Sequence, residues 1–156
     1  MSLAKDVQEQ IENMIVPHLL QIGFAGSYPD WRRVHTEGVD VVTFQLELHG
    51  EPRLCVEYGF TSPFSRVQLG TTVITPENLT TAALKFTSRR RLNPEVVDLQ
   101  SSVPDYWYSF VDGDIEGCAK RIRTDLSIAE DWWKYMTDKE IIAQTAPAFF
   151  KKVERA

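Results

Sequence analysis

A strict alternation of apolar and polar residues between Val39 and Phe60 is the feature that most constrains this chain. Apolar side chains occupy every second position on both sides of a break that contains Gly50 and Pro52. They are Val42, Phe44, Leu46 and Leu48 before the break, and Leu54, Val56, Tyr58 and Phe60 after it. Because successive side chains of a strand point to opposite faces, the pattern predicts a β-hairpin with one apolar and one polar face.

Apolar residues at helical spacing flank this hairpin at both ends of the chain. Residues 3–22 predict an amphipathic helix that kinks or breaks at Pro17 and stops at Gly23. Residues 115–136 repeat the helical spacing after an acidic start, where negative charge favours a helix N-terminus. The sequence Thr-Asp-Lys-Glu at 137–140 has the form of a capping box, so we expect a fresh helix there, interrupted at Pro147.

Shorter patterns predict further strands. We expect them at residues 31–36, at 67–73 as a third strand of a meander, at 81–92 and at 106–111. The order therefore predicts a single α+β domain over residues 1–156. It comprises a mostly antiparallel sheet of five or six strands, with an N-terminal helix and two or three C-terminal helices packed on one face.

Composition excludes several classes of function. The net charge of -5 and the pI near 5.2 argue against a general nucleic-acid surface, which is usually basic. The sequence has no signal peptide and no run of about 18 apolar residues, so we expect no membrane association and a cytoplasmic location. Its two cysteines form no disulfide framework, which agrees with a reducing compartment.

No catalytic or metal-binding motif stands out. The three histidines, His18, His35 and His49, lack metal-ligand spacing, so we expect no metal and no cofactor. Cys55 is predicted on the polar face near Glu57, whose carboxylate would raise the thiol pKa, and a catalytic thiolate needs the opposite. Whether the chain is an enzyme stays open at this point.

Arg90 is the basic residue that the pattern sets apart. It is in register with Leu84 and Leu92, so it is expected to point inward, unless the register slips at the end of the strand. An inward arginine needs a carboxylate, backbone carbonyls or an anionic ligand. A protein carboxylate is the ordinary solution. In the ligand hypothesis, Arg90 and Arg33 hold an anion and Trp107 walls the pocket.

Adjacent tryptophans mark the second candidate surface. Trp132 and Trp133 lie about 100° apart on a helix, so both cannot occupy the centre of one face. We expect one of them to be half exposed. Trp132 is the candidate partner-binding residue, and the structural alternative is a boundary residue that covers the sheet edge.

Several short segments together resemble a catalogued bacterial family. They are Leu19–Phe24 with Trp31-Arg32-Arg33 and Val42–Leu48, then Leu84-Lys85-Phe86 through Arg91-Leu92, Trp107-Tyr108, and Trp132–Asp138. In these the chain resembles the domain of unknown function with the number 4304, over roughly residues 5–145. The resemblance implies a small bacterial cytosolic α+β domain and carries over no catalytic residue.

Two classes of function remain. The first is a binding module that recognises a protein partner or forms a homodimer; an immunity-like or antitoxin-like role fits only by analogy. The alternative is a small domain that binds an anionic ligand, or an unrecognised enzyme, with its site between sheet and helices.

Overall fold

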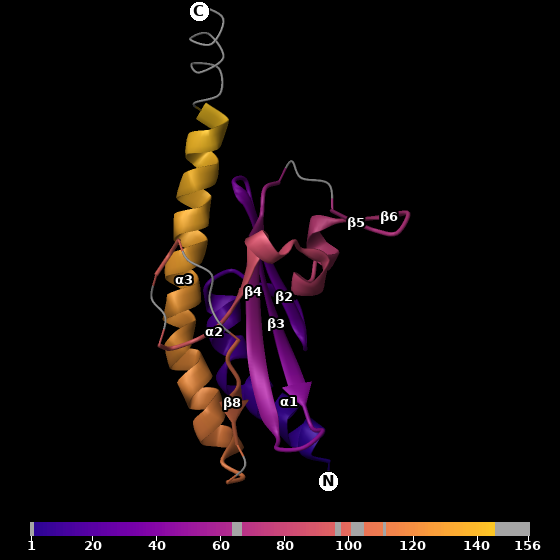
Figure 1. Ribbon diagram of the computed structural model, residues 1–156, viewed down its shortest axis with the longest axis vertical. Coiled ribbons are helices and arrows are strands. Elements are labelled where there is room, and N and C mark those ends of the chain that lie inside the picture. Colours follow the sequence, from indigo (N-terminus) through magenta and orange to yellow (C-terminus); the bar gives the residue numbers. More distant parts are fainter. Residues whose placement is uncertain (1, 64–66, 96–97, 101–104, 111, 146–156) are drawn as a thin grey trace, which may run out of the picture.

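An antiparallel sheet carries the helices of this chain (Figure 1). The computed structural model describes residues 2–63, 67–95, 98–100, 105–110 and 112–145. Within them the strand order is β1-β2-β3-β4-β7, and β8 pairs with the first residues of β4. The strands are β1 (Ala25–Ser27), β2 (Asp30–His35), β3 (Gly38–Glu47), β4 (Arg53–Thr61), β7 (Arg89–Arg91) and β8 (Tyr108–Ser109). The predicted α+β class and the six-stranded antiparallel sheet are confirmed.

The alternating stretch forms the central hairpin, β3 and β4. Val42 pairs with Tyr58 and Phe44 with Val56, so the apolar residues share one face, as expected. The opposite face is less polar than predicted, because residues 79–84 cover part of it. Val39 and Val41 form a second buried cluster with Leu79 and Leu84.

The N-terminal helix breaks where the proline predicts it. α1 (Leu3–Met14) ends at Ile15, and α2 (Val16–Gln21) begins with Pro17 in its first turn. Proline is tolerated there because a first-turn amide has no helical partner. Gly23, with φ of 99°, ends α2. The amide of Phe24 then donates to the carbonyl of Leu19 at 2.9 Å, so the predicted C-terminal stop is confirmed.

Up to residue 145, where the described part of the chain ends, the C-terminal region forms one helix rather than the expected two or three. α3 (Ile115–Thr145) runs for 31 residues through the predicted capping box. The expectation of a fresh helix at 137–140 is wrong, because no glycine or proline precedes that motif to stop the first helix. Pro147 lies outside the described residues.

Two strand predictions also need correction, and one strand was not expected. Residues 67–73 do not extend the meander: β5 (Val67–Leu69) and β6 (Thr72–Ile74) form a separate hairpin that projects from the molecule (Figure 1). Residues 81–92 contain two 3-10 turns, η2 (Thr81–Ala83) and η3 (Phe86–Ser88), before β7. The turn after Gly23 holds an additional strand, β1, that the sequence pattern did not indicate.

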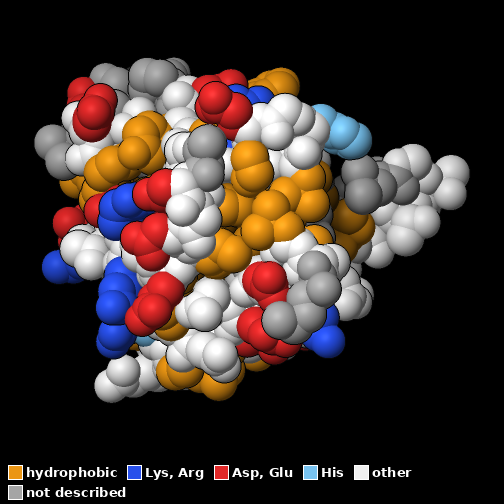
Figure 2. All heavy atoms as spheres, turned by 90° about the horizontal axis from the view of Figure 1, so that it is seen from below, with side chains coloured by type: hydrophobic (Ala, Val, Ile, Leu, Met, Phe, Trp, Pro, Cys, Tyr) orange, Lys and Arg blue, Asp and Glu red, His pale blue; other side chains and the backbone are white. Residues whose placement is uncertain are grey.

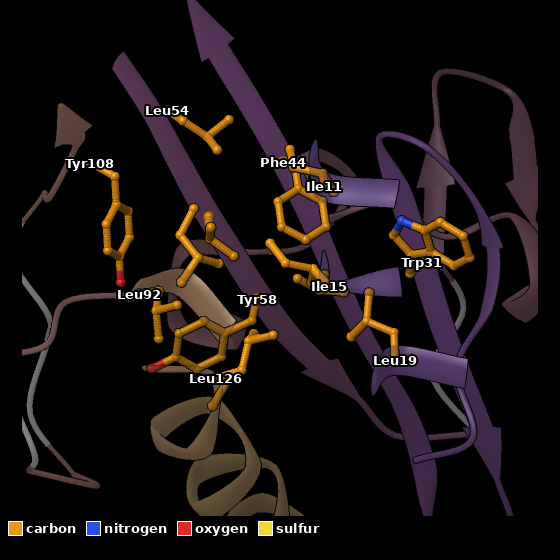
Figure 3. Packing of buried hydrophobic residues seen from close by; sticks show 14 of the residues in the cluster. Ile11, Ile15, Leu19, Trp31, Phe44, Leu54, Tyr58, Leu92, Tyr108 and Leu126 are labelled. Carbon is orange, nitrogen blue, oxygen red and sulfur yellow. The ribbon is translucent and has the colours of Figure 1, made fainter. Parts of the chain in front are cut away.

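Helices cover the apolar face of the hairpin. Figure 3 shows Ile11, Ile15 and Leu19 from the N-terminal helices facing the sheet that carries Phe44, with Leu126 of α3 near Tyr58. These residues belong to one buried cluster, which also contains both adjacent tryptophans.

Both tryptophans are buried, which corrects the expected half-exposed residue. Trp132 is 3% exposed and Trp133 1% exposed. Each ring packs edge-on against Tyr58, with centroids at 5.3 and 5.8 Å. The indole N–H of Trp133 also donates to the carbonyl of Gly59 at 2.8 Å. Because the Tyr58 ring contacts both tryptophans, the two neighbouring side chains are buried together.

The continuity of α3 gives a direct test. Asp114 precedes the helix and its carboxylate accepts from the amide of Gly117 at 2.9 Å, as an N-cap does. We expect Asp114→Ala to lose about 1 kcal/mol of unfolding free energy. Thr137→Ala should be neutral or stabilise by a few tenths of a kcal/mol, since alanine favours a helix interior. Urea denaturation measures both, and a loss of similar size in Thr137→Ala would show that a helix starts there.

Candidate functional site

A cleft of about 540 Å³ opens between β7 and the C-terminal half of α3. The 3-10 turn η3 and the segment after β7 contribute to its walls. It is lined by Glu57, Phe86, Thr87, Arg89, Arg90, Arg91, Leu99, Gln100, Asp105, Trp132, Tyr135, Met136 and Lys139. The cleft has the size of a typical ligand pocket, although its walls carry more charge than is usual.

The cleft follows the edge of the sheet, because β7 is the last strand on its side. Arg90 pairs with Tyr58, so its side chain lies on the helix-covered face. Arg89 and Arg91 alternate with it and lie on the opposite face, opposite Gly59 and Glu57. Side chains from both faces of one short strand therefore border the same opening.

Arg90 points inward, as its register with Leu92 predicts, whereas Leu84 belongs to the buried cluster on the opposite face because residues 81–88 are not a strand. Its guanidinium carbon lies 5.7 Å from the ring centre of Trp132, and its Nη2 donates to the carbonyl of Asp98 at 2.7 Å. The carbonyl and the aromatic ring both fix the position of the guanidinium. Arg90 is half-buried and lines the cleft.

Arg89 and Arg91 are balanced by acidic neighbours. Each contacts the Glu57 carboxylate, at 3.3 and 3.8 Å, and Arg91 also reaches Asp105 at 3.8 Å. Both arginines thus pair with Glu57 across the strands. On this face the two positive charges meet two negative ones.

Trp107 lies on the face that carries Arg91. The guanidinium groups of Arg53 and Arg91 lie 4.1 and 4.9 Å from its ring centres. Tyr108 is buried in the main core, and adjacent residues of an extended chain point to opposite faces. Trp107 is therefore turned away from Arg90, and it is not among the residues that line the cleft.

Arg33 lies away from the cleft as well. Its Nε is 2.8 Å from Oδ2 of the buried Asp40, and its Nη1 donates to the carbonyl of Ile22 at 2.9 Å and contacts Glu130 at 3.3 Å. The guanidinium also lies over Trp133. Strands β2 and β7 are three strand spacings apart, about 14 Å, so Arg33 and Arg90 do not meet at one ligand.

The net charge of the cleft lining is opposite in sign to the net charge of the chain. Among the described residues, its lining holds four cationic side chains, Arg89, Arg90, Arg91 and Lys139, and two acidic ones, Glu57 and Asp105, an excess of two positive charges. The whole chain carries -5. Figure 2 views the opposite end of the molecule and shows acidic side chains around a central apolar area. The positive charge of the cleft is thus a local feature.

Cys55 is buried, although the alternation placed it on a polar face. Its Sγ–H donates to Oε1 of Gln45, with 3.6 Å between the heavy atoms. The pKa of the thiol is raised to about 11, mainly by burial; the charge of Arg91 acts to lower it and that of Glu57 to raise it. Such a thiol is a poor nucleophile, as the sequence indicated, but burial is the larger cause.

The described residues show neither a metal site nor a membrane span. No group of three or more His, Cys, Asp or Glu side chains is placed to hold a metal ion in that part of the chain. No described helix is long and apolar enough to cross a membrane.

Sequence reasoning missed half of the cleft. Tyr135, Met136 and Lys139 on α3 line it opposite Arg90. A helix start at 137–140 would separate Lys139 from Tyr135 and Met136, so the sequence pattern did not indicate that the three share one continuous helix. Phe86 is 86% exposed at the rim, under the guanidinium of Arg89.

Comparison with known proteins identifies the family. A family model described as "Domain of unknown function (DUF4304)" matches residues 15–138. The resemblance seen in the sequence is therefore confirmed. No curated protein and no solved structure matches the chain.

The raised pKa of Cys55 predicts its reactivity. With a pKa of about 11, about one thiol in a thousand is ionised at pH 8. We expect iodoacetamide to leave Cys55 unmodified in the native protein at pH 8 and to modify it rapidly in 8 M urea, as mass spectrometry of peptides would show. Fast modification of Cys55 without denaturant would contradict the buried placement.

The environment of Arg33 predicts a structural role. Arg33→Met keeps the aliphatic length but removes the guanidinium from the buried Asp40, whose other side-chain neighbour among the described residues is His35, at 3.1 Å. We expect a loss of about 3 kcal/mol in unfolding free energy. The double variant with Asp40→Asn should lose less than the sum of the single variants, because the uncompensated charge is gone. Additive losses in urea denaturation would refute the pairing.

Proposed function

We propose that this chain, which belongs to the family described as Domain of unknown function (DUF4304), is a binding module that holds an anionic ligand in the cleft beside β7. The observation that carries the proposal is the excess of positive charge in the cleft, +2 in a chain of -5. A concave site of one sign attracts ligands of the opposite sign, because its walls concentrate the field.

Arg90 is the residue that we assign to direct contact with the anion. Its contacts with the Asp98 carbonyl and the Trp132 ring fix the plane of the guanidinium beside the opening. A planar guanidinium presents paired N–H donors that match a carboxylate or a phosphate. Lys139, whose ammonium lies 5.4 Å from the ring centre of Tyr135, supplies a second cation from α3.

The sequence suggested three residues as ligand contacts, and the proposal keeps only one of them. Arg90 remains in the proposal. Arg33 and Trp107 leave it, because the first is committed to Asp40 and the second lies on the other face of the sheet.

Recognition of a protein partner is the second candidate. Phe86 at the rim is 86% exposed, and an exposed aromatic ring beside a charged cleft is typical of a surface that contacts another protein. Trp132 is 3% exposed, so its role in partner binding would be limited to the floor of the cleft. An immunity-like or antitoxin-like role and a homodimer stay predictions, as does catalysis.

Anion binding can be tested with citrate as the probe. Calorimetric titration at low ionic strength should show binding to the wild type and about tenfold weaker binding to Arg90→Gln, the scale of one hydrogen bond to a charged group. Arg123→Gln is the matched control, because Arg123 is exposed on α3 and does not line the cleft. Salt should weaken binding through screening. Equal affinity of all three proteins, or no heat with any, would overturn the proposal.

A further inference from the structure

Backbone groups of β7, and not only its side chains, face the cleft. The amide of Leu92 donates to the carbonyl of Val56 at 2.8 Å. In an antiparallel ladder this direction alternates, so the backbone groups of Arg90 face β4 and those of Arg89 and Arg91 face outward. Among the described residues, no backbone hydrogen bond reaches these outward groups.

We propose that the ligand is an extended acidic segment of a partner protein, which adds a strand to β7. This inference rests on the proposed anion binding at the same cleft. An edge strand with unpaired backbone groups is a template for another strand. Arginines along such an edge disfavour pairing with a neutral or basic strand, so the same residues select a strand that carries negative charge.

The two faces of the edge differ in what they can bind. On the face of α3 the cleft presents Arg90 and Lys139 together with Trp132, Tyr135 and Met136. On the other face, Glu57 and Asp105 already balance Arg89 and Arg91, and Phe86 lies exposed beneath Arg89.

This asymmetry determines the pattern of the added strand. Side chains of a strand alternate between faces. Acidic residues at every second position would therefore face Arg90 and Lys139, and the apolar residues between them would face Phe86. The β7 edge is three residues long, about 10 Å, so a segment of about five residues covers it.

Backbone geometry predicts which amides of the segment matter. In an antiparallel addition, the residues opposite Arg89 and Arg91 share their face and point their N–H groups at β7. These are the apolar residues of the segment. The N–H groups of the acidic residues then point away, whereas in a parallel addition the two sets exchange roles.

The test uses the peptide acetyl-Glu-Val-Glu-Val-Glu-amide with a fluorescent label, measured by anisotropy. We expect it to bind the wild type, to bind Arg90→Gln and Lys139→Gln about tenfold more weakly, and to bind Arg123→Gln as it binds the wild type. The same peptide with lysine in place of glutamate should not bind.

Two N-methylated peptides test strand addition itself, since they keep the charges and remove chosen N–H donors. Methylation of the valines should weaken binding about tenfold and methylation of the glutamates should not, if the strand is antiparallel; the reverse result indicates a parallel strand. Equal effects of both patterns, or none, would overturn strand addition.

The outcomes separate the two proposals. If citrate binds through Arg90 but the peptide does not, or if the peptide binds regardless of methylation, the inference fails while anion binding stands. If neither citrate nor the peptide binds, both fail.

Discussion

The packing of two adjacent tryptophans on Tyr58 is the contact on which the rest of this structure depends. Trp132 and Trp133 both meet the tyrosine ring edge-on, and the indole N–H of Trp133 is anchored to the backbone of β4. Because Tyr58 pairs directly with Arg90, this contact sets the C-terminal half of α3 beside the edge strand. Beyond that contact α3 continues, whereas the sheet ends at β7, and the cleft lies between the two.

Each of the two tryptophans also contacts one arginine. Arg33 lies over Trp133 and Arg90 over Trp132, on different strands of one face. Arg33 is drawn into the fold by the buried carboxylate of Asp40, and a buried charge of this kind needs its partner to be tolerated. Arg90 meets a carbonyl instead, at the border of the cleft. Two residues of one type thus differ in place: Arg33 is paired with a buried carboxylate, and Arg90 lines the cleft.

Local patterns predicted the elements that depend on near neighbours in the chain. The alternation at 39–60 predicted β3 and β4, and Pro17 with Gly23 predicted the break and the end of the N-terminal helix. Short segments were predicted less well. Residues 67–73 have the spacing of a sheet strand, but whether such a strand joins the main sheet depends on partners distant in the sequence. The candidate site shared this limit, since only Arg90 and Trp132 of its lining were singled out as candidate site residues in advance.

The sequence by itself determined the fold class, the faces of the central hairpin and the inward direction of Arg90, because each follows from the periodicity of the backbone. It also determined family membership. Only the tertiary structure decided that α3 is continuous, that Cys55 is buried, and that Lys139 and Tyr135 lie opposite Arg90. These depend on which surfaces pack together, and a local pattern carries no information about the side chains that arrive from elsewhere in the chain.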